Sequence, residues 1–258
     1  MLNQHKLLTS DRVRPILRGR FGEPYFWSET CSSTQDALRD ASLPEGAVAV
    51  TEHQDAGRGR EGRAWADVTG RSLLLSVLLR PPGSGPAEQL SLVAGLAVAE
   101  AIDATAGTRS QVKWPNDVLL EGRKVAGILL EATGGVVICG IGVNVDQTEE
   151  ELPGGTRLPA TSLRVATGGR PERADLLVEL LGTLERRYDA WLGGGLAPLL
   201  PELERRHALR GRRVRLGDET GTVGQIAPDG RLTLTCADGT VVLITSGEVY
   251  VLEEPVTD

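Results

Sequence analysis

A series of short apolar segments between residues 112 and 145 most limits the folds open to this chain. Strand-like runs occur around VKW, DVLLE, RKVAGILLEA and GGVVICGIGVNV. Two more strands are predicted earlier, at residues 46–54 (GAVAVTEHQ) and 71–79 (RSLLLSVLL), and Pro81 and Pro82 end the second one. Strands this close together, joined by tight glycine turns, predict a mostly antiparallel or mixed sheet.

Helical patterns surround these strands. AEQLSLVAGLAVAEAIDATAG (87–107) places apolar residues at helical spacing and ends at Gly107. GGRPERADLLVELLGTLERRYDAWLGGG (168–195) predicts an amphipathic helix opened by Pro171, and residues 197–211 are expected to continue helically. A shorter helix is expected in SSTQDALRDA (32–41), and residues 1–24 are expected to form a short helical or irregular lead-in. The predicted fold class is therefore α/β (α+β), with the sheet backed by helices.

The sequence pattern changes from helical to strand-like after Gly211. Short alternating strands follow, with turn signals at PDG (228–230) and ADG (237–239). A segment of this size is typical of a small SH3-like β-barrel. We therefore predict two domains, a larger one over residues 1–208 and a C-terminal barrel over residues 209–258.

Charge and composition exclude several classes of protein. The formal net charge is −7, whereas general nucleic-acid binders are usually basic. The three cysteines form no CxxC pair, and the three histidines make no metal or triad pattern. The N-terminus lacks the apolar core of a signal peptide, and no apolar run approaches the ~20 residues that span a bilayer. We expect a cytoplasmic protein without a membrane partner.

Only three of the 28 basic residues are lysines, and only three residues are asparagines. Two of those lysines and one of the asparagines fall in one short window, at Lys113, Asn116 and Lys124. Because the compact charge of lysine is not equivalent to the fork of arginine, these positions indicate a site with specific chemistry, unless the clustering is chance.

The loop DAGRGREGRAW (55–65), called here the Arg-Gly loop, follows the predicted strand 46–54 directly. Glycines let a backbone approach a ligand, and arginines fork onto phosphate oxygens, so the loop is suited to binding a polyanion. The alternatives are a solvated loop without a ligand and an RNA-binding Arg-Gly segment. Trp65 favours a nucleotide, because a large aromatic ring beside phosphate donors is able to cap an adenine.

VKWPNDVLLEGRKVAGILLE (112–131) is the second element that carries chemistry. Pro115 fixes a turn between two strands, which gathers Lys113, Asn116 and Lys124 at strand ends. Asp117 is suited to hold Mg²⁺ beside phosphates, although a turn cap is an equal alternative. In the third element, GIGVN (140–144), the side chain of Asn144 is able to read a base edge.

The motifs SSTQD, HQDAGRGREGRAW, KWPND, GRKVAGIL and GIGVN, in this order and spacing, resemble those of biotin–protein ligases. The resemblance covers residues 25–250 and implies an α/β catalytic domain related to class II aminoacyl-tRNA synthetases and lipoyl ligases. Many members carry an N-terminal winged-helix repressor domain. The lead-in of this chain is too short for one, so the resemblance is to the monofunctional kind and no DNA partner is expected.

The resemblance also implies roles for residues. The biotin site would comprise Ser33, Thr34, Gln35, Gln54, Arg58, Gly59, Arg60, Lys124 and Gly127. The ATP site would comprise Arg58, Arg60, Arg63, Trp65, Lys113, Asn116 and Asn144. The catalytic residues would be Arg60, Lys113, Asp117 and Lys124, with Mg²⁺ held by Asp117. Trp65 is given the adenine because the downstream stretch LPATSL has no aromatic residue.

The reaction implied is activation of biotin by ATP to biotinyl-5′-AMP, followed by transfer to one lysine of a biotin carboxyl carrier domain of an acyl-CoA carboxylase. Either Asp117 takes the proton of the attacking amine or positioning of the anhydride suffices. A lipoate or octanoate ligase on the same fold is the nearest rival, and a non-catalytic biotin-binding regulator is another. The expected assembly is a monomer or a weak homodimer.

Overall fold

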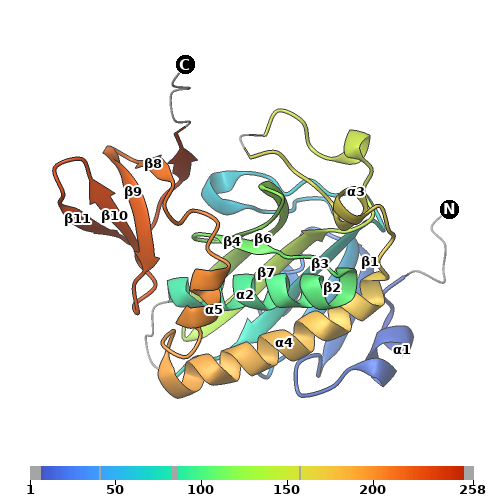
Figure 1. The fold of residues 1–258 in the computed structure, drawn as a ribbon. Helices are drawn as coiled ribbons and strands as arrows, with labels where there is room; N and C mark the ends of the chain where they lie inside the picture. Colours follow the sequence, from blue (N-terminus) through green and yellow to red (C-terminus); the bar gives the residue numbers. More distant parts are fainter. Residues whose placement is uncertain (1–6, 41, 83–86, 157, 253–258) are drawn as a thin grey trace.

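The computed structural model describes residues 7–40, 42–82, 87–156 and 158–252. A seven-stranded sheet with the order β1-β2-β3-β7-β6-β5-β4 forms its centre (Figure 1). The strands are β1 (Tyr25–Cys31), β2 (Val48–Gln54), β3 (Ser72–Leu79), β4 (Gln111–Lys113), β5 (Asp117–Leu120), β6 (Arg123–Thr133) and β7 (Val136–Asn144). Only β1 and β2 pair in parallel; the other neighbours are antiparallel, so the predicted mixed sheet is confirmed.

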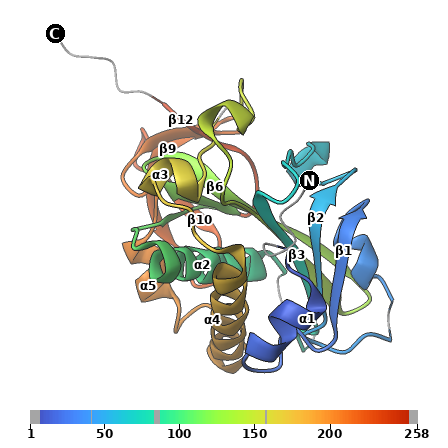
Figure 2. The ribbon, with the colours of Figure 1, turned by 90° about the vertical axis from the view of Figure 1, so that its right-hand side faces the viewer.

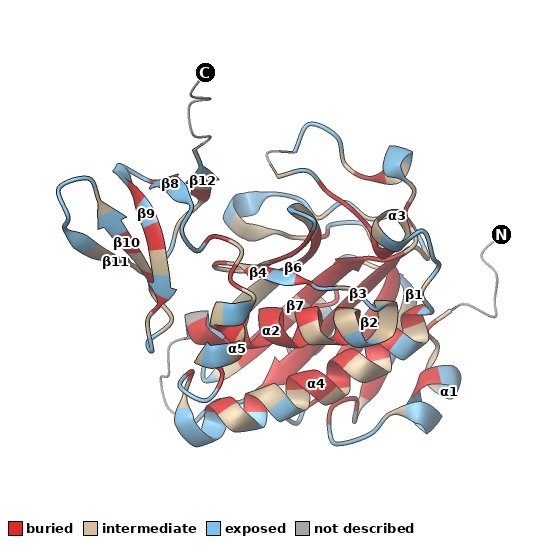
Figure 3. Ribbon diagram, in the orientation of Figure 1, coloured by how far each residue is buried: buried red, intermediate tan, exposed pale blue. Residues whose placement is uncertain are grey.

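The middle strands are apolar because the sheet is covered there. All eight residues of β3 (SLLLSVLL) are buried, and so are most residues of β7, its partner in register from Ser72↔Asn144 to Leu79↔Val137. Figure 3 shows this burial as a continuous band through the centre of the sheet. The two strands form a stiff base from which the neighbouring loops project.

Two long helices, α2 (Ala87–Ala106) and α4 (Arg173–Gly194), pack against each other across one face of the sheet (Figures 1 and 2). Their leucine stripes enter the main core, which confirms the predicted sheet backed by helices. The shorter helices are α1 (Ser10–Val13), α3 (Leu163–Thr167) and α5 (Leu200–Arg205). Single 3-10 turns occupy η2 (Arg14–Ile16), η3 (Asp36–Leu38), η4 (Arg60–Gly62) and η5 (Glu149–Glu151).

α2 contains an 18-residue stretch, Gln89–Ala106, with a mean hydropathy of 1.3, which is apolar enough for a membrane span by length and composition alone. The sequence-based statement that no apolar run approaches that length is therefore wrong. The apolarity has another cause here, because 72% of the stretch is buried inside the protein.

Two predicted helices differ from the observed ones. The expected helix over residues 32–41 is reduced to the 3-10 turn η3, because residues 33–35 are buried with side chains bonded to other strands. The helix predicted over 168–195 begins at Arg173, two residues after Pro171, and does not run on into α5. Gly195 has φ of 61°, a left-handed conformation that ends α4.

A second, five-stranded antiparallel sheet follows, with the order β11-β10-β9-β8-β12. Its strands are β8 (Arg213–Leu216), β9 (Glu219–Ile226), β10 (Leu232–Cys236), β11 (Val241–Ile244) and β12 (Val249–Val251). Gly230 and Gly239, with φ of 89° and 84°, lie in the two hairpin turns that PDG and ADG predicted. The predicted C-terminal β unit is thus present, while its boundary at residues 208/209 stays a prediction.

Candidate active site

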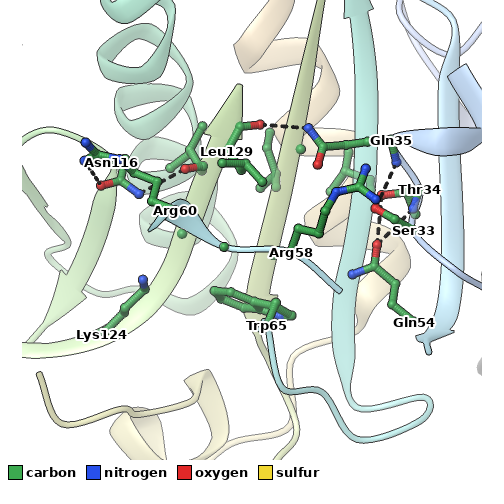
Figure 4. Close-up of a pocket in the computed structure, with 17 residues that line it drawn as sticks. Ser33, Thr34, Gln35, Gln54, Arg58, Arg60, Trp65, Asn116, Lys124 and Leu129 are labelled. Atoms are coloured by element: carbon green, nitrogen blue, oxygen red, sulfur yellow. Dashed lines mark hydrogen bonds between the residues drawn. The ribbon is translucent and has the colours of Figure 1, made fainter. Parts of the chain in front are cut away.

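Two adjoining cavities open beside the Arg-Gly loop. The inner pocket is lined by residues 33–35, Gln54, the loop, and glycines of β6 and β7 (Figure 4). The outer cleft lies between the loop, the β4–β5 turn, the C-terminal residues 247–251, and four residues that precede α3, namely Pro153, Thr156, Leu158 and Ala160. Five residues line both cavities, namely Gly59, Arg60, Trp65, Asn116 and Lys124. Most of the residues predicted for the two ligands are therefore brought together around one junction.

The closed end of the inner pocket is polar and internally bonded. Gln54, the last residue of β2, accepts hydrogen bonds from the backbone N–H of Thr34 (2.9 Å) and from its hydroxyl (3.3 Å). The Gln35 amide donates to the carbonyl of Leu129 at 3.3 Å. These side chains and Ser33 are buried or half-buried, so they are fixed before any ligand binds.

Sequence reasoning missed Ser76 and Leu129. The hydroxyls of Ser76 and Thr34 lie 2.7 Å apart, and Ser76 is fully buried in β3. The apolar wall of the pocket comes from Leu75, Ile128, Leu129 and Ile141. A serine inside the strand SLLLSVLL was the available signal for Ser76, because a buried hydroxyl needs a partner.

Trp65 lies across a floor made by two glycines. Gly127 of β6 and Gly142 of β7 are partners in register, and an added Cβ would lie 2.9 Å and 2.5 Å, respectively, from the indole ring. Gly127, predicted to offer its backbone to biotin, is thus also needed to seat this ring. The indole N–H is buried without a hydrogen-bond partner, and the Lys124 ammonium lies 5.6 Å from the ring centroid. Trp65 lines both cavities, and its predicted adenine contact stays a prediction.

Lys124 and Asp117 form an ion pair at the junction of the cavities. Lys124 Nζ is 2.6 Å from Asp117 Oδ1, and their side chains are 29% and 15% exposed. Adjacent strands place the two residues, since Asp117 opens β5 and Lys124 lies near the start of β6. The backbone N–H of Lys124 donates to the carbonyl of Pro159, and the carbonyl of Lys124 accepts from the N–H of Thr161. These two bonds fix the direction of the Lys124 backbone.

Arg60 and Asn116 join the Arg-Gly loop to the β4–β5 turn. Arg60 Nη1 donates to Asn116 Oδ1 at 3.0 Å, and the Asn116 amide donates to the carbonyl of Ile128, also at 3.0 Å (Figure 4). The loop backbone closes on itself, with Gly59 N–H to Arg63 C=O at 2.7 Å and Trp65 N–H to Gly57 C=O at 2.9 Å. The loop is therefore a small hairpin whose side chains reach in several directions.

Two arginines of the loop are held by carboxylates. Arg58 is bonded to Asp36 and Glu131, and the Arg58 guanidinium holds the pKa of the Asp36 carboxyl below its usual value. Arg63 pairs with Glu248, just before β12, and so ties the loop to the C-terminal sheet. Neither acidic partner of Arg58 nor Glu248 was found from sequence, because nothing local marks a carboxylate that meets an arginine many residues away.

Lys113 and Asn144 line the outer cleft, as do Asn116 and Asp117. The Asn144 amide is already engaged: it donates to the carbonyl of Thr161 at 3.0 Å and accepts from Gln147 at 3.1 Å. Reading of a base edge by this side chain would compete with those bonds, and the role stays a prediction.

His53 and the cysteines lie outside the two cavities. His53 is next to last in β2, and its Nδ1 lies 2.7 Å from a carboxylate oxygen of Asp67, so its side chain is held by a neighbouring acid at the end of the strand. Cys139 is fully buried in the core on β7, and burial raises the pKa of its thiol to about 12.

Within the described ranges, no three His, Cys, Asp or Glu side chains are grouped so that they could hold a metal ion. Mg²⁺ is usually bound through one or two carboxylates together with phosphate oxygens. The single carboxylate of Asp117, at the wall of the outer cleft, fits an ion that arrives on a phosphate ligand. The metal and turn-cap interpretations of Asp117 both stay predictions.

The two cavities differ in size. The inner pocket has a volume of about 50 Å³ and the outer cleft one of about 410 Å³. Ligand pockets commonly measure ~300–1,000 Å³. The inner pocket is therefore smaller than this range, whereas the outer cleft falls within it.

Comparisons with known proteins identify the family of the chain. Residues 24–147 match the Biotin/lipoate A/B protein ligase family. A biotin–[acetyl-CoA-carboxylase] ligase of Mycobacterium tuberculosis is 35% identical in an alignment 265 residues long, gaps included, which covers 93% of this chain and 97% of that protein. The biotin protein ligase from Aquifex aeolicus in complex with biotin and ATP superposes with a TM-score of 0.80 at 30% identity, covering 89% of this chain and 98% of that one.

The bifunctional ligase/repressor BirA of Bacillus subtilis is 36% identical over 187 residues, and the match spans only 58% of its length. The relatives that match over nearly their whole length decide the assignment. This chain belongs to the biotin/lipoate A/B protein ligase family, and its relatives within that family are biotin–protein ligases.

Proposed function

We propose that this chain is an ATP-dependent biotin–protein ligase. It joins biotin and ATP to biotinyl-5′-AMP with release of pyrophosphate, and then transfers the biotinyl group to one lysine of a biotin carboxyl carrier domain. The observation that carries the proposal is the junction of the two cavities, where Arg60 and Lys124 line both. A carboxylate in the inner pocket and a triphosphate in the outer cleft would meet between these cations.

The inner pocket suits the biotin head and chain. Biotin is apolar except for its ureido ring and carboxylate tail, so its site needs apolar walls and a few polar groups. Ser33, Thr34 and Gln54 supply such groups at the closed end, and leucine and isoleucine side chains supply the walls. The tail would then point toward Lys124, at the open end.

The junction addresses the difficulty of the first step. A carboxylate attacks the α-phosphorus of ATP, a bond to pyrophosphate breaks, and two anions must approach each other. Cations fixed in advance at that point stabilise the charge that builds up in the transition state. Arg60 and Lys124 line both cavities and Lys113 lines the outer cleft, which supports this role for them. Mg²⁺ carried by the triphosphate would add charge beside Asp117.

Protection of the adenylate is the task proposed for the Arg-Gly loop. A mixed anhydride hydrolyses when water reaches it, and closed loops exclude water from such intermediates. The hairpin of the loop, with Arg60 bonded to Asn116, covers the junction between the cavities.

The second step is attack by a lysine amine, which arrives mostly protonated because its pKa is ~10.4. Proton removal by Asp117 and simple positioning of the anhydride remain the two routes. The names of the full-length relatives support a carboxylase carrier domain as acceptor. A cytoplasmic location, a monomeric or weakly dimeric state, and the lack of a DNA partner remain predictions.

Isotope exchange between ATP and pyrophosphate tests the proposal. We expect exchange that requires biotin and is not supported by lipoate, and a single biotinylated lysine on a carrier domain by mass spectrometry. Lys124→Gln should lower the exchange rate by about 100-fold, because it removes a charge aimed at the transition state. Exchange with lipoate in place of biotin would assign the chain to the lipoate ligases instead.

A further inference from the structure

Arg58 of the Arg-Gly loop is clamped by two acidic residues from other parts of the chain. Its Nη1 and Nη2 donate to the two oxygens of Asp36 at 3.1 and 3.0 Å, and its Nε donates to Glu131 at 3.1 Å. All three guanidinium nitrogens are thus used. The Asp36 contact has the two-bond geometry in which arginine binds carboxylates most strongly.

Arg39 completes the cluster from outside. It donates to Asp36 at 2.9 Å and to Glu131 at 2.8 Å, so the same two carboxylates bind both arginines. Two cations and two anions alternate in this ring, and Ser32 adds a bond to Asp36 at 3.1 Å. The carboxylates are therefore held in place independently of Arg58.

The cluster lies at the rim of the inner pocket. Asp36 follows Gln35, and Glu131 lies two residues after Leu129, whose carbonyl accepts the Gln35 amide. Arg58 itself lines that pocket. The two carboxylates thus lie next to the wall residues Gln35 and Leu129 in the chain, while Arg58 belongs to the Arg-Gly loop.

We propose that Asp36 and Glu131 are positioning residues that hold the Arg-Gly loop over the inner pocket through Arg58. A ligand anion would have to compete with both carboxylates for this guanidinium. The work of Arg58 is therefore to keep the loop closed, while Arg60 and Lys124 face the reacting groups. The retained ligand is the acyl-adenylate, a point that rests on the proposed function.

Removal of both charges tests the clamp. In Asp36→Asn/Glu131→Gln we expect biotinylation of bystander lysines to rise about tenfold and KM for biotin to rise several-fold, with kcat of ATP–pyrophosphate exchange within about twofold of the parent. The Arg58 and Asp36 side chains are each 33% exposed, so salt should screen the clamp. Bystander labelling by the parent should therefore rise with NaCl concentration, whereas labelling by the double variant should not.

Glu23→Gln is the matched control. Glu23 binds Arg14 through three hydrogen bonds of similar length but lies at the opposite end of β1 from the pocket. The Glu23→Gln variant should equal the parent in bystander labelling, in KM for biotin and in its response to NaCl. Asp36→Glu keeps a carboxylate and should stay close to the parent, which separates lost charge from lost folding.

Hydrogen exchange of the loop tests the clamp without reference to catalysis. The backbone N–H groups of Gly59 and Trp65 are bonded within the loop hairpin and should exchange faster in the double variant than in the parent. If the parent shows no biotin-dependent exchange of pyrophosphate, the proposed function fails while this measurement still decides the clamp. Equal exchange of the loop amides in both proteins, or unchanged bystander labelling by an active double variant, overturns it.

Discussion

Gly142 shows how far a single residue controls the site. A Cβ at this position would lie 2.5 Å from Trp65 Cε2 and 2.6 Å from Cζ2, distances that require the indole to move. We expect Gly142→Ala to lower the free energy of unfolding by about 1–3 kcal/mol, the usual cost of overpacking. KM for biotin should rise about tenfold, equal to about 1.4 kcal/mol of binding energy. Urea unfolding and steady-state exchange kinetics measure the two effects.

Gly193→Ala is the control, because it makes the same substitution at a glycine that has room for a side chain. Gly193 lies in α4, and an added Cβ meets nothing within 4 Å. Alanine is favoured over glycine in a helix by about 0.5–1 kcal/mol, so this variant should be slightly more stable with an unchanged KM. If Gly142→Ala also left KM unchanged, the position of the Trp65 ring would have no effect on the binding of biotin in the inner pocket.

At the scale of secondary-structure elements, the contact between α5 and β4 contains a buried histidine that makes the stability of the protein depend on pH. His207 follows α5 and bridges to Val112 of β4, with a side chain that is 7% exposed. Neither ring nitrogen has a hydrogen-bond partner, and burial lowers the pKa of this histidine, while nearby Glu204 opposes the shift and Arg210 adds to it. The folded state thus binds the proton less readily than the unfolded state.

Stability should therefore fall as the pH drops below ~6.5, the pKa of an unfolded histidine, because the unfolded state takes up the proton first. The loss stops once the pH is below the lowered pKa of the folded state. In that window the slope is at most ~1.4 kcal/mol per pH unit for one group. His207→Phe should flatten it in urea unfolding at pH 5–8. A slope equal to that of the parent would show that His207 is not responsible.

Local sequence patterns predicted those helices and strands whose ends are set by residues within the same segment. β3 ends where Pro81 and Pro82 follow, and α2 ends at Ala106, beside the Gly107 stop. Thr34 and Gln35 failed this rule, because their side chains bond to β2, β3 and β6 and leave only the turn η3. The same distinction applies to the candidate site. The Arg-Gly loop and Lys124 were predicted from local motifs. The role of Asp36 and Glu131 was not, because it depends on contacts with Arg58, which is distant in the sequence.

At the scale of the whole molecule, the C-terminal sheet is joined to the larger part through part-buried hydrogen bonds and a shared apolar core. Trp114, which is 1% exposed, donates its indole N–H to the carbonyl of Gly230 at 3.0 Å. Gln89 of α2 donates to the carbonyl of Asp229 at 3.2 Å and accepts from Trp191 of α4 at 2.7 Å. Buried apolar residues of both sheets form one continuous core cluster. The turn of residues 228–230 is thus fixed against the helical layer.

A continuous core predicts that the two parts unfold together. We expect one calorimetric transition for the parent, with coincident changes in far-ultraviolet circular dichroism and tryptophan fluorescence. Trp114→Phe leaves the half-buried carbonyl of Gly230 without its donor, which costs about 0.5–1.5 kcal/mol, or roughly 1–6 °C in Tm for a chain of this size. Asp238→Ala changes the other hairpin turn, where an added Cβ on Gly239 meets nothing within 4 Å, and should shift Tm far less.

The alternative is that residues 209–258 form an independent unit, as two separate domains would. In that case the parent would show two transitions, and Trp114→Phe would lower only the one that belongs to the C-terminal sheet. The outcome matters for the site, because residues 247–251 form one wall of the outer cleft and Glu248 holds Arg63 of the Arg-Gly loop. A sheet that opened on its own would expose that cleft at temperatures where the larger part is still folded. Loss of the Arg63–Glu248 contact would then precede global unfolding, and ATP affinity would fall first.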